Sequence, residues 1–227
     1  MYAIAIDGPA SAGKSSVAKM LAKKLNILHL NTGSLYRAIG LYAYQNGLCS
    51  KKDDNGMPIV TKKDIEKMTT NANVEVKFLD GQQHTFLNGD DVSDLLKTPA
   101  ASDYSSRVSA VPEIRDHILE LQRKIARQHN VVMEGRDITS HVLPDAKYKF
   151  FVTASPEVRA ERCLNELLEK GLMSTYDEVL ASIKERDARD SNRSYCPLTI
   201  VKDAIVVDTS KMTLPEVADY ISKFIKE

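Results

Sequence analysis

The segment "GPASAGKS", residues 8 to 15, combines residue types that bind phosphate. Two glycines with four residues between them are followed by Lys14 and Ser15, which is the P-loop pattern. Glycines let backbone N–H groups approach phosphate closely, and a helix N-terminus adds partial positive charge. The lysine reaches the terminal phosphates of ATP, and the hydroxyl of Ser15 is expected to bind Mg²⁺. The predicted nucleotide-binding residues are Gly8, Pro9, Ala10, Ser11, Ala12, Gly13, Lys14, Ser15 and Ser16.

A second charged segment, "MEGRDITSHVLPDA", places Arg136 and Asp137 directly after an apolar run. This position is the carboxyl end of an expected strand, where α/β sheets bind their ligands. The segment "NTGSLYRA" similarly places Arg37 near the start of an expected helix that follows a strand. Both segments therefore provide candidate ligands for an anionic substrate.

A third charged segment, "YDEVLASIKERDARDSNRS", has the period of a helix. Steps of four, three, four and three residues place one set of side chains on a single stripe, which begins apolar and becomes charged. Such a helix leaves the core and borders a cleft, although an exposed ladder of ion pairs has the same spacing. The residues of the stripe are Val179, Ile183, Arg186, Asp190 and Arg193.

Short apolar runs alternate with helical patterns along most of the chain, which predicts an α/β fold. Such alternation gives a mostly parallel sheet covered on both faces. The pattern changes between about residues 40 and 97, where Val74, Val76 and Phe78 alternate before the turn Asp80-Gly81. We therefore expect an inserted hairpin. The strand-like runs of the main sheet are residues 2–6, 27–30, 131–134, 148–154 and 204–208.

Composition excludes several classes of protein. The 227 residues are 43% hydrophobic and carry a net charge of +0, which is unlike a dedicated nucleic-acid binder. No apolar run approaches the roughly 20 residues that a membrane helix needs. The early glycine in "MYAIAIDG" argues against a secretory signal, and three cysteines without metal spacing suggest a reducing cytosolic, cytoplasmic location.

Several features occur in this order along the chain: the P-loop, "TGSLYRA", the hairpin insertion, "SSRVSAVPEIR", "GRDITSHVLPDA" and "IKERDARDSNR". Together they resemble the bacterial cytidylate kinase family in its long form. The resemblance covers almost the whole chain. It implies a P-loop nucleoside monophosphate kinase with a five-stranded parallel sheet, which converts CMP and dCMP to CDP and dCDP with ATP. It also implies a core of residues 1–39 and 98–227, a lid near 156–171 and an acceptor-binding insertion at 40–97. We expect a monomer without nucleic-acid or membrane partners.

Functional residues follow from this resemblance by position. Lys14, Arg136, Arg186 and Arg162 are expected to be catalytic, and Arg159 and Arg162 fall where the family's lid carries arginines. The resemblance implies that Thr32, Arg37, Arg136 and Arg186 surround the acceptor phosphate and that Asp190 meets the sugar. Cytosine is expected to be read by Ser106, Arg115, Asp137 and Arg193. Departures from the family pattern occur at Asn31 and Glu134, where the family often has aspartate, and at Ser11, Thr139 and Ser140.

Other functions share parts of this pattern. A GTPase switch would need an Asp-x-x-Gly motif after an apolar strand, and Asp53 to Gly56 matches only the letters. A related P-loop kinase acting on UMP, AMP or a non-nucleotide acceptor is a second alternative, and an ATP-binding regulator without turnover is a third. Arg193 either holds Asp137 ionised or contacts the base directly, and both roles fit the sequence.

Overall fold

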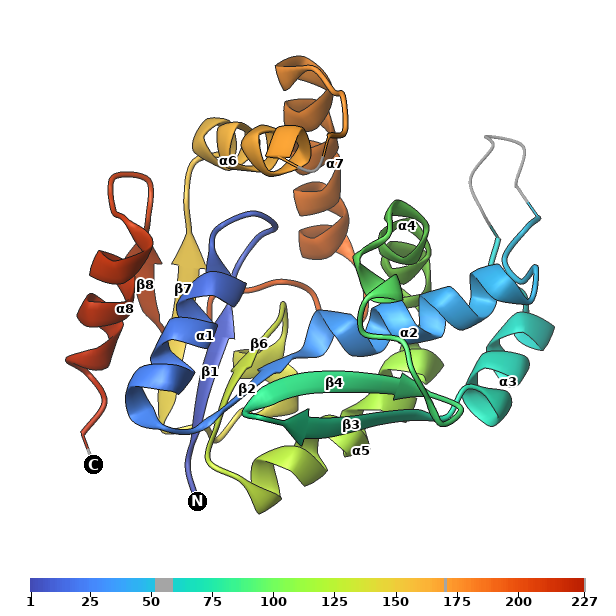
Figure 1. Ribbon diagram of the computed structural model, residues 1–227, viewed down its shortest axis with the longest axis horizontal. Coiled ribbons are helices and arrows are strands. Elements are labelled where there is room, and N and C mark those ends of the chain that lie inside the picture. The colour runs from blue at the N-terminus through green and yellow to red at the C-terminus, as the bar shows by residue number, and fades with distance from the viewer. Residues whose placement is uncertain (52–58, 170, 227) are drawn as a thin grey trace. The chain divides into compact units, whose positions relative to one another are not determined.

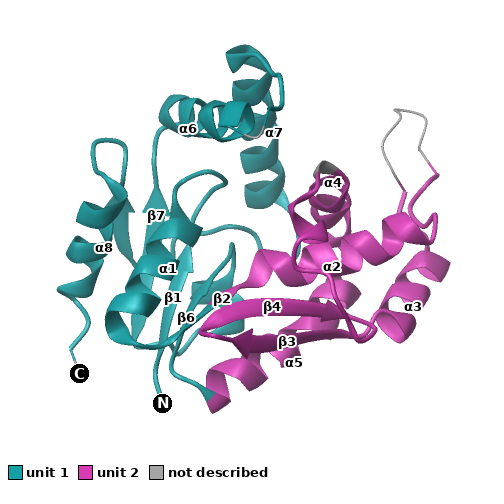
Figure 2. Cartoon of the chain, in the orientation of Figure 1, with its two compact units in different colours: residues 1–29, 129–227 teal, residues 30–128 magenta. Residues whose placement is uncertain are grey.

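The computed structural model describes residues 1–51, 59–169 and 171–226, and the chain forms two compact units (Figures 1 and 2). Unit 1 contains Met1–His29 and His129–Glu227, and unit 2 contains Leu30–Gln128. The Asp53–Gly56 segment that was weighed as a GTPase motif lies outside the described residues. Among the residues that are described, no helix is both long and apolar enough to cross a membrane.

The main sheet has five strands in the order β2-β6-β1-β7-β8. Strand β1 pairs in parallel with β6 on one side and β7 on the other, and β7 pairs in parallel with β8. The predicted five-stranded α/β sheet is therefore confirmed. The division between the units falls within β2. The elements with residues in unit 1 are β1 (Ala3–Asp7), α1 (Lys14–Leu25), β2 (Leu28–Asn31), β6 (Val131–Glu134), a π-turn (Ile138–Val142), β7 (Tyr148–Thr153), α6 (Pro156–Glu169), α7 (Tyr176–Asn192), β8 (Ile205–Asp208) and α8 (Leu214–Ser222).

A cluster of buried apolar side chains surrounds β1, the strand that leads into the P-loop. Ile4 and Ile6 of β1 are fully buried, and they pack with Leu21 of α1, Phe150 of β7 and Ile221 of α8. Helices α1 and α8 lie side by side in Figure 1 and contact each other. Because successive residues of β1 are buried on both faces, the strand reads as a continuous apolar run, as expected for a parallel sheet. The loop that follows β1 is thereby anchored at both ends.

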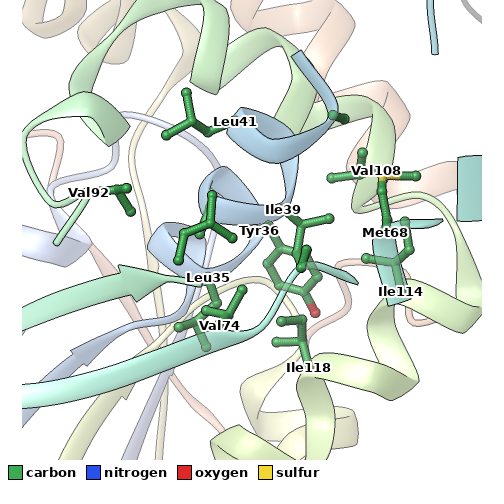
Figure 3. Packing of buried hydrophobic residues seen from close by; sticks show 14 of the residues in the cluster. Leu35, Tyr36, Ile39, Leu41, Met68, Val74, Val92, Val108, Ile114 and Ile118 are labelled. Atoms are coloured by element: carbon green, nitrogen blue, oxygen red, sulfur yellow. The ribbon is translucent and has the colours of Figure 1, made fainter. Parts of the chain in front are cut away.

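Unit 2 has its own core beneath a three-stranded sheet (Figure 3). Leu35 and Ile39 of α2 pack with Met68 of α3 and Ile118 of α5. Gly40 lets α2 approach α4 closely, because a Cβ atom there would lie 2.6 Å from the backbone nitrogen of Ser105. The elements are α2 (Thr32–Gln45), α3 (Lys62–Asn71), β3 (Val74–Leu79), β4 (Gln82–Leu87), β5 (Asp90–Asp91), a 3₁₀ turn (Leu95–Lys97), α4 (Pro99–Val108) and α5 (Pro112–Gln128).

The hairpin within the predicted insertion is confirmed. Strands β3 and β4 pair antiparallel with Val74 opposite Leu87. Unit 2 extends beyond residues 40–97 on both sides, to Leu30 and Gln128. Helix α4 was not predicted, although its N-cap residue Thr98 accepts a hydrogen bond from the backbone of Ala101. Its buried side chains, Ala101, Ser105 and Val108, are small, so its buried face lacks the large apolar residues that mark other helices.

Candidate active site

The P-loop has the tight backbone that its glycines predicted. Gly8 has φ +147°, and a Cβ atom there would lie 1.9 Å from the carbonyl oxygen of Val152. Gly13 is the N-cap residue of α1 with φ +85°, in the left-handed region that favours glycine. Ser11 has φ +56° without being a glycine. A larger residue at Gly8 would displace β7, so this position requires glycine for steric reasons.

Lys14 lies at the centre of a cluster of charges within unit 1. Its side chain is buried, and Nζ donates a 2.5 Å hydrogen bond to the carbonyl oxygen of Pro9. Burial, together with the positive charges of Arg136 and Arg186, holds the pKa of Lys14 well below its ordinary value. The nearby carboxylate of Glu134 acts in the opposite direction. Three cations therefore converge close to the P-loop, which is the charge pattern that a polyphosphate needs.

The carboxylate of Glu134 lies close to the hydroxyl of Ser15, which belongs to the first turn of α1. Glu134, at the end of β6, is buried, and its Oε1 lies 3.3 Å from Nε2 of His29. Burial alone would raise the pKa of Glu134, but the hydrogen bonds of His29 and Ser15 and the charge of Lys14 hold it below its ordinary value. An ionised carboxylate and an exposed hydroxyl are hard oxygen donors, which suit Mg²⁺.

This donor set is small. In the described part of the chain, no group of three or more His, Cys, Asp or Glu side chains could hold a metal ion. Mg²⁺ characteristically keeps several waters and shares its site with substrate phosphates, so it does not need an all-protein cage. The residues present therefore fit a metal ion that arrives with a nucleotide.

Asp7 was missed in the sequence, although it immediately precedes Gly8. Its side chain is fully buried, and Oδ1 accepts a 2.9 Å hydrogen bond from the backbone of Ile138. Oδ2 accepts hydrogen bonds from the backbone nitrogen and the hydroxyl of Thr139, at 2.7 and 2.6 Å. Asp7 therefore ties the end of β1 to the turn that follows Arg136. An acidic residue between a buried strand and the first P-loop glycine is the feature that could have revealed it.

Helix α7 carries the charged stripe, and the stripe is not an exposed ladder. Val179 and Ile183 are buried, whereas Arg186 and Asp190 are half-buried. Asp190 accepts a 2.9 Å hydrogen bond from Nε of Arg136, and the two side chains are only 15% and 20% exposed. Burial raises the pKa of Asp190, but Arg136 and the other arginines overcome this and lower it. Asp190 is thus a partly buried partner for a residue from another segment.

The prediction that Arg193 lies on this helical stripe is wrong. Helix α7 ends at Asn192, and Arg193 has an extended backbone with φ −62° and ψ 141°. Its Nη2 lies 3.8 Å from Oδ1 of the buried Asp137, and its Nε donates to the carbonyl oxygen of Cys196. Leaving the helix turns the guanidinium toward the segment after β6. The arrangement favours Arg193 as the counter-ion of Asp137.

Arg159 forms a buried clamp. Its Nε donates to the carbonyl oxygen of Ala154 at 2.9 Å, and Nη1 donates to the carbonyl oxygen of Ala10 in the P-loop at 3.3 Å. Two further hydrogen bonds, at 3.1 and 2.6 Å, reach both carboxylate oxygens of Asp187 on α7. Arg159 therefore joins β7, the P-loop and α7. A buried side chain with this many fixed partners positions the phosphate-binding loop.

Arg162 has equally definite partners. Its Nη1 donates to Oγ1 of Thr209 at 2.9 Å, and its Nη2 donates to the carbonyl oxygen of the same residue at 2.7 Å. Oγ1 of Thr209 in turn lies 3.4 Å from the carbonyl oxygen of Ala12 in the P-loop. Arg162 thus fixes the loop after β8 beside the P-loop. These two hydrogen bonds use only two of the five N–H donors of the guanidinium.

Replacing Arg159 by leucine is expected to destabilise the protein strongly. Removing one member of a buried ion pair leaves a poorly compensated charge, which costs about 3–5 kcal/mol. Replacement of Arg189 by leucine is the matched control, because Arg189 forms an exposed pair with Glu185 on α7. Exposed pairs contribute about 0–1 kcal/mol. Denaturant unfolding of both variants measures the difference. Equal stabilities would show that the clamp is unimportant.

The other predicted site residues lie in unit 2. Thr32 is buried at the start of α2, and Arg37 is half-buried one turn further along. Ser106 is half-buried on α4. Arg115 is buried on α5, where Nη1 donates to the carbonyl oxygen of Ser109 at 2.9 Å. The guanidinium carbon of Arg115 lies 5.2 Å from the centre of the Tyr36 ring.

The P-loop on a parallel sheet, with cations around its lysine, defines this protein as a member of the P-loop class of nucleotide-binding proteins. The profile of the cytidylate kinase family matches residues 4–227. The chain therefore belongs to the cytidylate kinase family.

Individual relatives agree with this assignment. A cytidylate kinase from Clostridium botulinum (strain Loch Maree / Type A3) is 45% identical over 224 residues, which cover 98% of this chain and 97% of the relative. A cytidylate kinase from Caldicellulosiruptor bescii is 41% identical over 214 residues, covering 94% and 91%. The crystal structure of an uncharacterized protein from Eubacterium ventriosum has a TM-score of 0.53 at 15% identity and covers 99% of this chain and 98% of its own. This last likeness concerns the fold alone.

Proposed function

We propose that the protein transfers the terminal phosphoryl group of ATP to CMP or dCMP, which gives ADP and CDP or dCDP. Membership of the cytidylate kinase family over nearly the whole chain is the observation that carries this proposal. The convergence of Lys14, Arg136 and Arg186 supports it, because two anionic substrates repel each other and need several cations between them.

The P-loop is proposed to bind ATP through residues 8–16. Backbone N–H groups and Lys14 would hold its phosphates, and Ser15, with Glu134 nearby, would hold Mg²⁺. A bound Mg²⁺ ion neutralises developing charge on the phosphates and orients them. Asp7 and Arg159 would not contact the nucleotide. They would position the P-loop, because Asp7 bonds to the backbone of Thr139 and Arg159 bonds to the carbonyl oxygen of Ala10.

The arginines are proposed to stabilise the transferred group. Phosphoryl transfer needs alignment and charge stabilisation more than covalent help, and a guanidinium binds two phosphate oxygens at once. Arg136 and Arg186 are the stronger candidates, since both act electrostatically on Lys14. Arg162 is a further candidate, and its guanidinium already donates two hydrogen bonds to Thr209. No general base is required, because the acceptor phosphate is already ionised.

The acceptor-binding residues are proposed from the family resemblance. Thr32 and Arg37 are assigned to the acceptor phosphate, and Asp190 is assigned to the sugar hydroxyls. The proposed base-reading residues are Ser106, Arg115, Asp137 and Arg193. The candidate lid is the segment near residues 156–171, which contains α6, and it would exclude water during transfer.

The acceptor panel is the direct test of this proposal. ADP formation from ATP is measured with CMP, dCMP, UMP, AMP and GMP, and donor preference is measured with ATP against GTP. We expect CMP and dCMP to be good acceptors, UMP to be poor, and AMP and GMP to be inactive. Faster turnover with UMP or AMP would identify a related kinase instead. ATP binding without transfer to any acceptor would support a regulator, and GTP preference would favour a switch protein.

A further inference from the structure

Gln83 of strand β4 holds the first turn of helix α2 in a network that the proposed function does not use. Its Oε1 accepts a 2.7 Å hydrogen bond from the backbone nitrogen of Asn31. Its Nε2 donates a 2.6 Å hydrogen bond to Oγ of Ser34. One amide side chain therefore grips the chain on both sides of Thr32 and Gly33. All of these residues belong to unit 2.

The network around Gln83 determines which way its amide points. The backbone nitrogen of Asn31 is a donor, so only the amide oxygen can face it. Ser34 Oγ donates to the carbonyl oxygen of Asn31 at 2.7 Å, which leaves its lone pairs for the amide nitrogen. Thr85 lies two residues further on the same face of β4, is buried, and places its Oγ1 3.2 Å from Oγ of Ser34. The sheet therefore meets α2 through an ordered polar contact.

The first turn of α2, which Gln83 holds, carries Thr32 and leads to Arg37, the two proposed ligands of the acceptor phosphate. Asn31 caps α2, since its Oδ1 accepts a hydrogen bond from the backbone of Ser34. A Cβ atom at Gly33 would lie 3.8 Å from Nη2 of Arg37, so this guanidinium folds back over the start of the helix. Thr32 is buried between the two points that Gln83 holds. The backbone at residues 31–34 thus determines where Thr32 and Arg37 point.

We propose that Gln83 is a positioning residue for acceptor binding: it holds the N-terminus of α2 in the conformation that receives the phosphate of the nucleoside monophosphate. This role rests on the proposed function. The proposal also assigns a role to the inserted hairpin. Strand β4 would preorganise the first turn of α2, since Gln83 and Asn31 are 52 residues apart in sequence. Preorganisation improves affinity by removing the ordering cost from the binding step.

Replacement of Gln83 by methionine is the main test, because methionine keeps the length and removes both hydrogen bonds. We expect the KM for CMP to rise about tenfold, since a lost hydrogen bond to a partly buried partner weakens binding by roughly that factor. The KM for ATP should change less than about twofold, because the loss affects acceptor binding only. Cytidine, which lacks the phosphate, should keep its inhibition constant. A structural defect would raise all three values together.

His84 provides the matched control on the same strand. Its side chain points to the other face of β4 and pairs with Asp91 at 2.7 Å. Replacement of His84 by alanine should leave the KM for CMP unchanged. Gln83→Glu is a second variant, because its carboxylate sets a negative charge beside Ser34 and should weaken CMP binding further than Gln83→Met does. Unchanged KM values for CMP in both Gln83 variants would overturn the proposal.

Amide hydrogen exchange separates this inference from the proposed function. Gln83→Met should speed exchange at residues 32–35 relative to the His84 control, whether or not the protein phosphorylates CMP. Unchanged exchange there would refute the positioning role even in an active enzyme. If exchange is faster in Gln83→Met but the wild-type protein does not phosphorylate CMP, Gln83 still holds α2, and both the proposed function and the acceptor role are refuted.

Discussion

Replacing Lys14 by alanine is expected to lower kcat about a thousandfold, since removal of one preorganised donor from a charge-stabilising site costs 10²–10³ in rate. In the proposed complex, the amine of Lys14 would contact the terminal phosphates of ATP directly. The fold should survive, because burial already disfavours the charged amine in the free protein. The measurement is kcat for ADP formation with saturating CMP and ATP, alongside the unfolding temperature.

Lys19 is the matched control for this experiment. It lies on the same helix, is exposed, and is not among the predicted nucleotide-binding residues. Lys19→Ala should keep wild-type kinetics and stability. A folded Lys14→Ala variant with a kcat within tenfold of the wild type would refute the assignment of the phosphate site. Loss of folding in Lys14→Ala alone would contradict the expectation that this amine contributes little to stability.

Replacing Asp137 by asparagine should lower the preference for CMP over UMP by a factor on the order of a hundred. Cytosine presents an amino donor where uracil presents a carbonyl oxygen, and a carboxylate only accepts hydrogen bonds. UMP therefore sets two acceptors against each other, and each unmatched buried polar group costs about 1–3 kcal/mol. Asparagine offers a donor as well as an acceptor, so it tolerates uracil. The ratio of kcat/KM for the two acceptors is the quantity to measure.

This ratio is insensitive to partial unfolding, because both acceptors are assayed with the same active enzyme. This property is useful because Asp137 is buried beside Arg193. The substitution removes the carboxylate that faces the guanidinium of Arg193 and could therefore lower stability. Asp145→Asn is the control, because Asp145 is exposed on the same segment and should leave the ratio unchanged. An unchanged ratio in Asp137→Asn would mean that other residues read the base.

The sequence by itself determined the class of fold and the position of the phosphate site. Apolar runs separated by helical patterns lead to a parallel sheet, and the P-loop is a local motif whose chemistry lies within nine consecutive residues. The same topological rule placed Arg136 and Asp137 at the carboxyl end of β6. The capping boxes at Thr61 and Thr213 are local in the same sense, since a helix cap depends on residues only three apart.

Only the tertiary structure decided how polar side chains pair across the fold. Asp190 meets Arg136 from 54 residues away, and spacing along α7 had suggested only its helical neighbours. Arg159 resembled a lid residue in sequence, yet it is buried against Asp187 and the P-loop. A polar side chain has many partners within reach in an unfolded chain, and packing selects among them. Gln83 shows this most clearly, because nothing in the sequence of the hairpin relates it to Asn31.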